Sequence, residues 1–250
     1  MGGLAGVDGC RAGWVIALAP AGDLSAPILH VVASFAEALV LAGERATVAV
    51  DMPVGLPERI EGPGRMPERL VRPLLGARQS SVFSIPARAA VQAPDYAAAC
   101  ALAAALSDPP RKVSKQGFMI FPRIREIDLM LRADPALAER VFESHPEVVF
   151  QALHGGTPLE LPKKVKSRPF PPGLDLRRGL LARAGVGEAA LTAPPPRGAG
   201  ADDLLDALAC LVCAAAVARG RATSYPTPPL RDAHGLPVAI WAPIAHKHAD

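Results

Sequence analysis

Residues 4–19, with the sequence LAGVDGCRAGWVIALA, decide the fold. The apolar runs Leu4–Asp8 and Trp14–Ala19 flank a polar, glycine-bounded turn at Cys10–Gly13, and this pattern predicts a β-hairpin. A third strand is predicted at Ile28–Ala33. The chain therefore opens with three consecutive strands.

A helix and a fourth strand are predicted to follow. Ser34 begins the helix, with Glu37 three residues later in a capping-box arrangement, and Gly43 ends it. The apolar run Thr47–Val50 is then a strand. A crossover through the helix allows the first and fourth strands to lie side by side and parallel, about 4.8 Å apart. The side chains that end these two strands are therefore expected to be neighbours.

The rest of the chain is predicted to complete a single α/β domain over residues 1–250, with a mixed central sheet and flanking helices. Proline makes up 27 of the 250 residues, about twice the usual share of roughly 5%. Many of these prolines lie in segment 52–140, which is interpreted as a helical insertion. Further elements are expected as helices at Pro67–Leu75, Asp95–Leu106, Ile124–Leu131, Val148–Leu153, Leu174–Ala184 and Asp202–Ala218, and as strands at Val141–Glu143 and Leu236–Trp241.

Composition favours a protein with a large core and leaves its partner open. Half of the residues are hydrophobic, and 27 basic side chains against 24 acidic ones give a net charge of +3, which neither requires nor opposes nucleic acid. Four cysteines are too few for a disulfide scaffold, and the Cys210–Cys213 pair within an apolar run predicts buried packing. The absence of a long unbroken apolar run predicts a cytoplasmic protein without a membrane span.

Four aspartates occupy positions where an unpartnered carboxylate is costly. Asp8 and Asp51 end apolar strands, and the carboxyl ends of strands are where ligands bind in open α/β sheets. Asp203 and Asp206 lie three residues apart, on one face at the start of the last predicted helix. If that helix packs beside the first strand, the four carboxylates converge and repel one another unless a divalent cation neutralises them.

Such an all-oxygen cluster suits Mg²⁺ or Mn²⁺. Two ions about 3.5–4 Å apart would activate an attacking water and stabilise the leaving oxygen of a phosphodiester, so the pattern predicts a hydrolase acting as a metal-dependent nuclease. A structural interpretation is also open for most of these residues: Asp8 and Asp51 as turn residues, and Asp202 or Asp203 as a helix cap. Asp206 is the exception, because it lies a full turn inside the helix.

Glu143 is a fifth candidate acid, at the end of a strand-like run. His145 can orient a water molecule or contact a phosphate, although a hydrogen-bonded structural role is an equal alternative. Several basic residues are predicted to contact the nucleic-acid backbone, and an ordinary solvated charged surface is the alternative for them. These basic candidates are Arg11, Lys115, Arg123, Arg125, Lys163 and Lys164.

Six ordered motifs span nearly the whole chain. They are VDGCRAGW at 7–14, VDMPVGLP at 50–57, SSVFSIPAR at 80–88, KQ at 115–116 with PRIREID at 122–128, FESHPE at 142–147, and DDLLDA at 202–207. Together they resemble the family catalogued as domain of unknown function 429, whose members are described as predicted ribonuclease H-like nucleases.

The resemblance implies a ribonuclease H-like fold with catalytic acids on the first strand, on the fourth strand and at the start of the last helix. By motif, these roles correspond to Asp8, to Asp51, and to Asp203 with Asp206, whereas Glu143 has no certain counterpart. The Asp-x-x-Asp-Ala pattern is also similar to the last helix of bacterial Holliday-junction resolvases. DNA or RNA is therefore the implied partner.

Two other classes of function remain open from the sequence. An actin-like or sugar-kinase-like ATPase also begins with a strand ending in Asp-Gly, but it requires a second glycine-rich phosphate loop, and the sequence has no duplicated half. A non-catalytic nucleic-acid-binding or scaffold protein can retain the same carboxylates, since a fold does not imply an activity.

Overall fold

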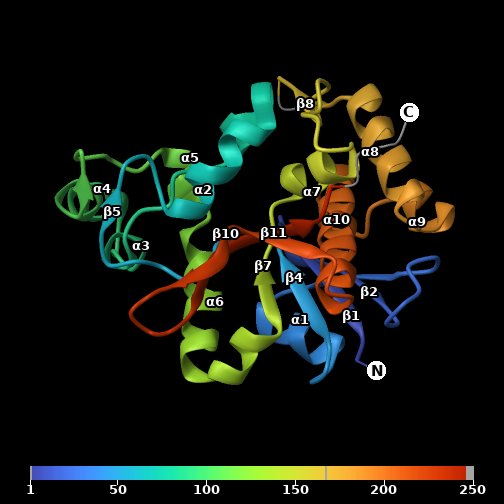
Figure 1. Cartoon of the computed structure of the whole chain (residues 1–250), viewed down its shortest axis with the longest axis horizontal. Coiled ribbons are helices and arrows are strands. Elements are labelled where there is room, and N and C mark those ends of the chain that lie inside the picture. Colours follow the sequence, from blue (N-terminus) through green and yellow to red (C-terminus); the bar gives the residue numbers. More distant parts are fainter. Residues whose placement is uncertain (1, 167, 246–250) are drawn as a thin grey trace.

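A five-stranded mixed sheet forms the centre of the protein, as seen in a computed structural model that describes residues 2–166 and 168–245 (Figure 1). The strand order is β3-β2-β1-β4-β7, with β1 antiparallel to β2 and parallel to β4, and with β4 parallel to β7. The strands are β1 (Leu4–Cys10), β2 (Gly13–Ala19), β3 (Ile28–Val32), β4 (Thr47–Val50) and β7 (Val141–Glu143). The carboxyl ends of β1, β4 and β7 therefore meet at one edge of the sheet.

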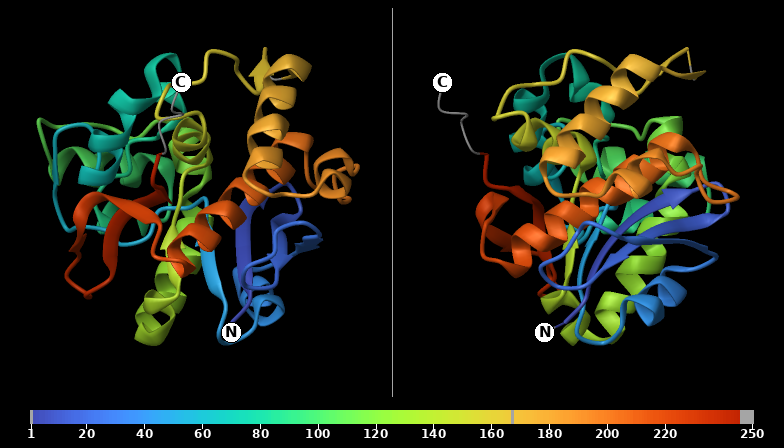
Figure 2. Two further views of the ribbon diagram at one scale, coloured as in Figure 1. Left: turned by 45° about the vertical axis from the view of Figure 1, so that its right-hand side comes forward. Right: turned by 90° about the vertical axis from the view of Figure 1, so that its right-hand side faces the viewer.

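Both faces of the sheet are buried along β2, β1, β4 and β7, which explains why these strands are nearly continuous apolar runs, whereas the edge strand β3 is partly exposed. Alternate side chains enter different cores. Ala17 and Ala49 pack with residues of α10 (Ala201–Ala218), whereas Val7 and Val50 pack with residues of α1 (Phe35–Ala42) and α6 (Phe121–Ala133). Figure 2 shows α10, in orange, crossing the blue strands.

A glycine on β1 allows α10 to approach the sheet very closely. A Cβ atom at Gly6 would lie 2.1 Å from the carbonyl oxygen of Ala207 and 2.1 Å from the backbone nitrogen of Leu211. Because no side chain other than hydrogen fits that space, backbone packs directly on backbone here. This contact places the first turns of α10 beside the end of β1.

Most of the predicted elements are confirmed. The Ser34 hydroxyl accepts a hydrogen bond from the Glu37 backbone N–H at 3.2 Å, and Gly43 ends α1 with φ of +84°. The other helices are α2 (Met66–Val71), η1 (Arg72–Ser81), α3 (Arg88–Val91), α4 (Tyr96–Ala105), α5 (Lys115–Met119), η2 (Pro135–Glu139), α7 (Pro146–Leu153), α8 (Pro171–Arg183) and α9 (Glu188–Thr192), where η denotes a 3₁₀ helix.

One long strand was not predicted. β10 (Ala222–Arg231) contains prolines, which cannot donate a hydrogen bond to a neighbouring strand and are unfavourable within a sheet. Among the residues that the structure describes, its strand partner is β11 (Pro237–Pro243), and the register shifts between Tyr225 and Leu230. The remaining short strands are β5 (Ile60–Glu61), β6 (Ser107–Asp108), β8 (Lys164–Val165) and β9 (Arg168–Pro169).

Three further sequence expectations concern the periphery and the cysteines. The tail at 246–250, expected to fray, lies outside the described residues. Cys210 and Cys213 are buried free thiols, as predicted. None of the helices in the described part of the chain has the length and apolar character needed to cross a membrane.

Candidate metal centre

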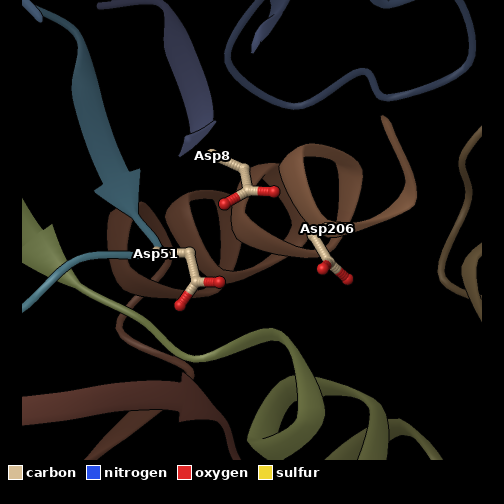
Figure 3. Close-up of side chains that lie close together, drawn as sticks. All are labelled: Asp8, Asp51 and Asp206. Atoms are coloured by element: carbon tan, nitrogen blue, oxygen red, sulfur yellow. The ribbon is translucent and has the colours of Figure 1, made fainter. Parts of the chain in front are cut away.

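Three aspartates from distant parts of the chain converge at the carboxyl edge of the sheet. Carboxylate oxygens of Asp8, Asp51 and Asp206 all lie within 4.8 Å of one another (Figure 3). Asp8 lies on β1, and Asp51 directly follows β4 and donates its backbone N–H to the Val7 carbonyl at 2.9 Å. The predicted neighbourhood of these side chains is therefore confirmed.

Burial makes the negative charge of this acidic triad, Asp8, Asp51 and Asp206, costly. Burial, followed by the charges of Asp51 and Asp206, raises the pKa of Asp8 well above its usual range. Burial also raises the pKa of Asp51 to about 7 and that of Asp206 to about 7, although the nearby Lys163 ammonium opposes both shifts. When carboxyl groups are buried from solvent and lie this close together, a bound cation stabilises their ionised form.

An unsatisfied oxygen points to the same conclusion. Asp206 is 6% exposed, and its Oδ1 is buried without a hydrogen-bond partner among the described residues. Buried carboxylate oxygens are normally hydrogen-bonded or bound to a metal. The donor set consists only of oxygens, so the residues fit a hard divalent cation.

A lysine lies inside the acidic cluster, which the sequence did not predict. Lys163, expected to contact phosphate, instead bonds through its ammonium group to Oδ2 of Asp206. The same nitrogen lies 3.6 Å from Oε1 of Glu147. Glu147 in turn receives two hydrogen bonds of 2.8 Å from the buried guanidinium of Arg177. No spacing pattern distinguished Lys163 from the other basic residues of its segment.

Asp203 does not join the triad. Its Oδ2 accepts a hydrogen bond from the Gly200 backbone N–H at 2.8 Å, which is the role of a helix-capping residue. It lies near enough to Asp8 for its charge to raise the pKa of Asp8. Asp202 forms an ion pair of 2.5 Å with Lys164. Asp203 thus caps α10 through Oδ2 and lies outside the acidic triad, and the metal role predicted for it stays a prediction.

Glu143 is held by a buried arginine. Arg65 donates to Oε1 of Glu143 at 2.6 Å and to its Oε2 at 3.1 Å, and the Val54 backbone N–H donates to the same Oε2 at 2.8 Å. Arg65 also pairs with Glu68 at 2.5 Å. Since both carboxylate oxygens are engaged, the structure assigns Glu143 a supporting role next to Asp51, in place of the catalytic role predicted for it.

The remaining candidates divide into cavity-lining, structural and exposed residues. A cavity of about 170 Å³ lies beside the triad and is lined by Asp8, Asp51, Arg123 and His145. Arg125 instead donates to the carbonyls of residues 91 and 93, at 2.6 and 2.7 Å, and so fixes the end of α3. The predicted phosphate-contact role of Arg125 is not supported, because these bonds hold its guanidinium. Two other basic candidates are exposed away from the cavity lining: Arg11 and Lys115.

Arg123 and His145, the two basic candidates that line the cavity, differ in their hydrogen bonds. Arg123 donates to the Cys10 carbonyl and lies 5.8 Å over the ring of Trp14. The Nε2 atom of His145 lies 3.4 Å from the Ser81 carbonyl, and its Nδ1 is buried without a partner in the described part of the chain. Burial lowers the pKa of His145. A mostly neutral imidazole and one arginine thus line the cavity beside the triad.

The fold and the site define an α/β protein with a buried acidic triad that can bind a metal ion. The chain matches the family described as protein of unknown function (DUF429) over residues 6–231, which is most of its length, and it belongs to that family. No curated protein and no solved structure is significantly similar to it.

Proposed function

We propose that the protein is a metal-dependent nuclease that hydrolyses phosphodiester bonds of DNA or RNA. The observation that carries this proposal is the convergence of three carboxylates, one of which, Asp206, has an Oδ1 atom that is buried without a hydrogen-bond partner among the described residues. A divalent cation bound there supplies a Lewis acid for a phosphoryl oxygen and lowers the pKa of a bound water. Mg²⁺ and Mn²⁺ are the proposed ions, because both prefer oxygen ligands.

The order of the elements supports a ribonuclease H-like architecture for this proposal. Three antiparallel strands, a crossover helix and a parallel fourth strand lead to acids on β1 and after β4. The third acid lies on the last helix, α10. These are the three positions at which the resemblance to ribonuclease H-like nucleases places catalytic acids.

The chain's own residues would bind the metal and position the substrate. Asp8, Asp51 and Asp206 hold the cation, and Arg123 offers positive charge on the cavity wall for a phosphate. His145 presents an unpartnered ring nitrogen that can orient a water molecule. Exposed basic residues such as Lys115 and Arg11 would contribute screened attraction to a nucleic-acid backbone.

The test combines metal binding with cleavage. Metal-free protein is titrated with Mn²⁺ in a calorimeter, and labelled single-stranded DNA, duplex DNA, RNA and four-way junctions are incubated with protein and Mg²⁺ or Mn²⁺. We expect metal-dependent cleavage of at least one substrate by the wild type and none by Asp8→Asn. The matched control is Glu44→Gln, which removes a carboxylate from an exposed position outside the triad. Equal cleavage by wild type and Asp8→Asn would refute the assignment, and metal binding without any cleavage would favour the non-catalytic alternative.

A further inference from the structure

We propose that the acidic triad binds one divalent ion, and that the ammonium group of Lys163 takes the place of a second. This inference rests on the proposed function and deepens it, because it names the set of cations at the same site. It replaces the pair of ions that the sequence pattern alone predicts.

The first argument is that Lys163 already engages one of the two oxygens through which Asp206 could bridge a pair of ions. Its Nζ bonds to Oδ2 of Asp206, while Oδ1 of the same carboxylate remains without a partner among the described residues. An aspartate that bridges two ions uses one oxygen for each. Asp206 is therefore arranged to bind one ion through Oδ1 and the lysine through Oδ2.

The second argument is a balance of charge. The ionised triad carries three negative charges, and Lys163, in contact with Asp206, carries one positive charge. Glu147 does not alter this balance, because the Arg177 guanidinium neutralises it and donates to both of its carboxylate oxygens at 2.8 Å. For the triad and Lys163 alone, one divalent ion brings the sum of charges to zero, whereas two would leave an excess of two positive charges before any substrate bound. The nearby Asp203 carboxylate would reduce that excess to one.

The third argument is that the lysine is held in place by its own segment. Gly173 lies so close to this segment that a Cβ there would be 1.8 Å from the Pro162 carbonyl. The buried Arg177 donates to the Leu161 carbonyl at 3.0 Å, and the Phe170 N–H donates to the Lys163 carbonyl at 2.8 Å. The Lys163 side chain is only 21% exposed. An ordinary surface lysine has none of these restraints.

In this arrangement Lys163 forms no covalent bond and transfers no proton. Its charge lies where the second ion of a two-ion site would lie, and it stabilises the negative charge that develops on the transferring phosphate. Lys164, the next residue, points to Asp202 at the start of α10 and is 46% exposed. It belongs to the same segment but not to the cluster, so it serves as a matched control.

The experiment counts ions, so it does not depend on activity. Metal-free wild type, Lys163→Met and Lys164→Met are each titrated with Mn²⁺, by calorimetry and by electron paramagnetic resonance of the bound ion. We expect one Mn²⁺ per chain in the wild type and in Lys164→Met. We expect two in Lys163→Met, with the spectrum of a spin-coupled pair. Lys163→Arg keeps the charge and is expected to bind one.

Each other outcome has a definite meaning. Two ions bound to the wild type would overturn the inference. This result needs no variant, so the inference can be refuted even if Lys163→Met fails to fold. One ion in both the wild type and a folded Lys163→Met, checked by circular dichroism, would also overturn it, and the nuclease proposal would remain. No bound ion in the wild type would overturn both. The expected ion counts without cleavage of any nucleic acid would overturn only the nuclease proposal.

Discussion

Replacing Asp8 with asparagine should stabilise the metal-free protein while it destroys the metal site. Asn is nearly the same size as Asp, so the change removes the ionisable group and leaves the packing of β1 against α10 intact. In the wild type without metal, the Asp8 carboxylate is buried beside those of Asp51 and Asp206. We therefore expect opposite effects of the substitution on stability and on metal binding.

The magnitude follows from the separation of the charges. Triad oxygens lie within 4.8 Å of one another, and at an effective dielectric constant of about 20 two unit charges at that distance repel by about 3.5 kcal/mol. The pKa values of Asp51 and Asp206, both about 7, leave each of these groups roughly half ionised at pH 7. An ionised Asp8 is therefore repelled by two half charges, and the two repulsions together amount to about 3.5 kcal/mol. This is the upper limit of the gain, because the pKa of Asp8 is itself raised. For a chain of this size, a gain of up to about 3.5 kcal/mol corresponds to a rise in Tm of up to about 7–14 °C.

Differential scanning calorimetry at pH 7 in the presence of a chelator measures this effect. Glu44→Gln is the control for loss of an exposed charge and is expected to change Tm by less than about 2 °C. With excess Mn²⁺ the order should reverse, because binding stabilises only the wild type. A metal-free Asp8→Asn protein that melts at or below the temperature of the wild type would refute the reasoning that burial and mutual repulsion strain the triad.

Three more predictions concern pH, packing and the support of the site. Carboxyls whose folded pKa is raised bind more protons in the folded state, so the metal-free wild type should lose stability as the pH rises from about 4 to 7; urea denaturation at several pH values checks this, and saturating Mn²⁺ should flatten the decline. Gly6→Ala should lower the free energy of unfolding by about 3 kcal/mol and weaken Mn²⁺ binding, because the new Cβ atom would clash with the backbone of α10. Gly3→Ala is the control and should be tolerated, since the nearest atom to its Cβ would lie at 3.6 Å. Thermal melts and calorimetry compare the two variants. Glu143→Gln should destabilise the protein by about 3 kcal/mol, since it leaves Arg65 less well neutralised, and should leave the Mn²⁺ count unchanged; a lost ion with unchanged stability would instead identify Glu143 as a ligand.

The sequence by itself determined the central topology and the position of two acids. Alternating and continuous apolar runs, together with the helix ends at Ser34 and Gly43, are local signals, and they predicted the first four strands and their connecting helix. Strand ends are visible in the sequence, so Asp8 and Asp51 could be placed at one edge of the sheet. Asp206 could be recognised because no capping role is available inside a helix.

Only the tertiary structure decided which charged groups pair. Spacing along the chain does not distinguish Lys163 from Lys164. Yet Lys163 pairs with Asp206 of the triad, whereas Lys164 pairs with Asp202 at the start of α10. Nor does it show that Arg65 engages Glu143, 78 residues away in the chain. The physical reason is that periodicity and capping are properties of neighbouring residues, whereas the partner of a buried charge is set by which backbones can approach each other, here through the close packing at Gly6 and Gly173.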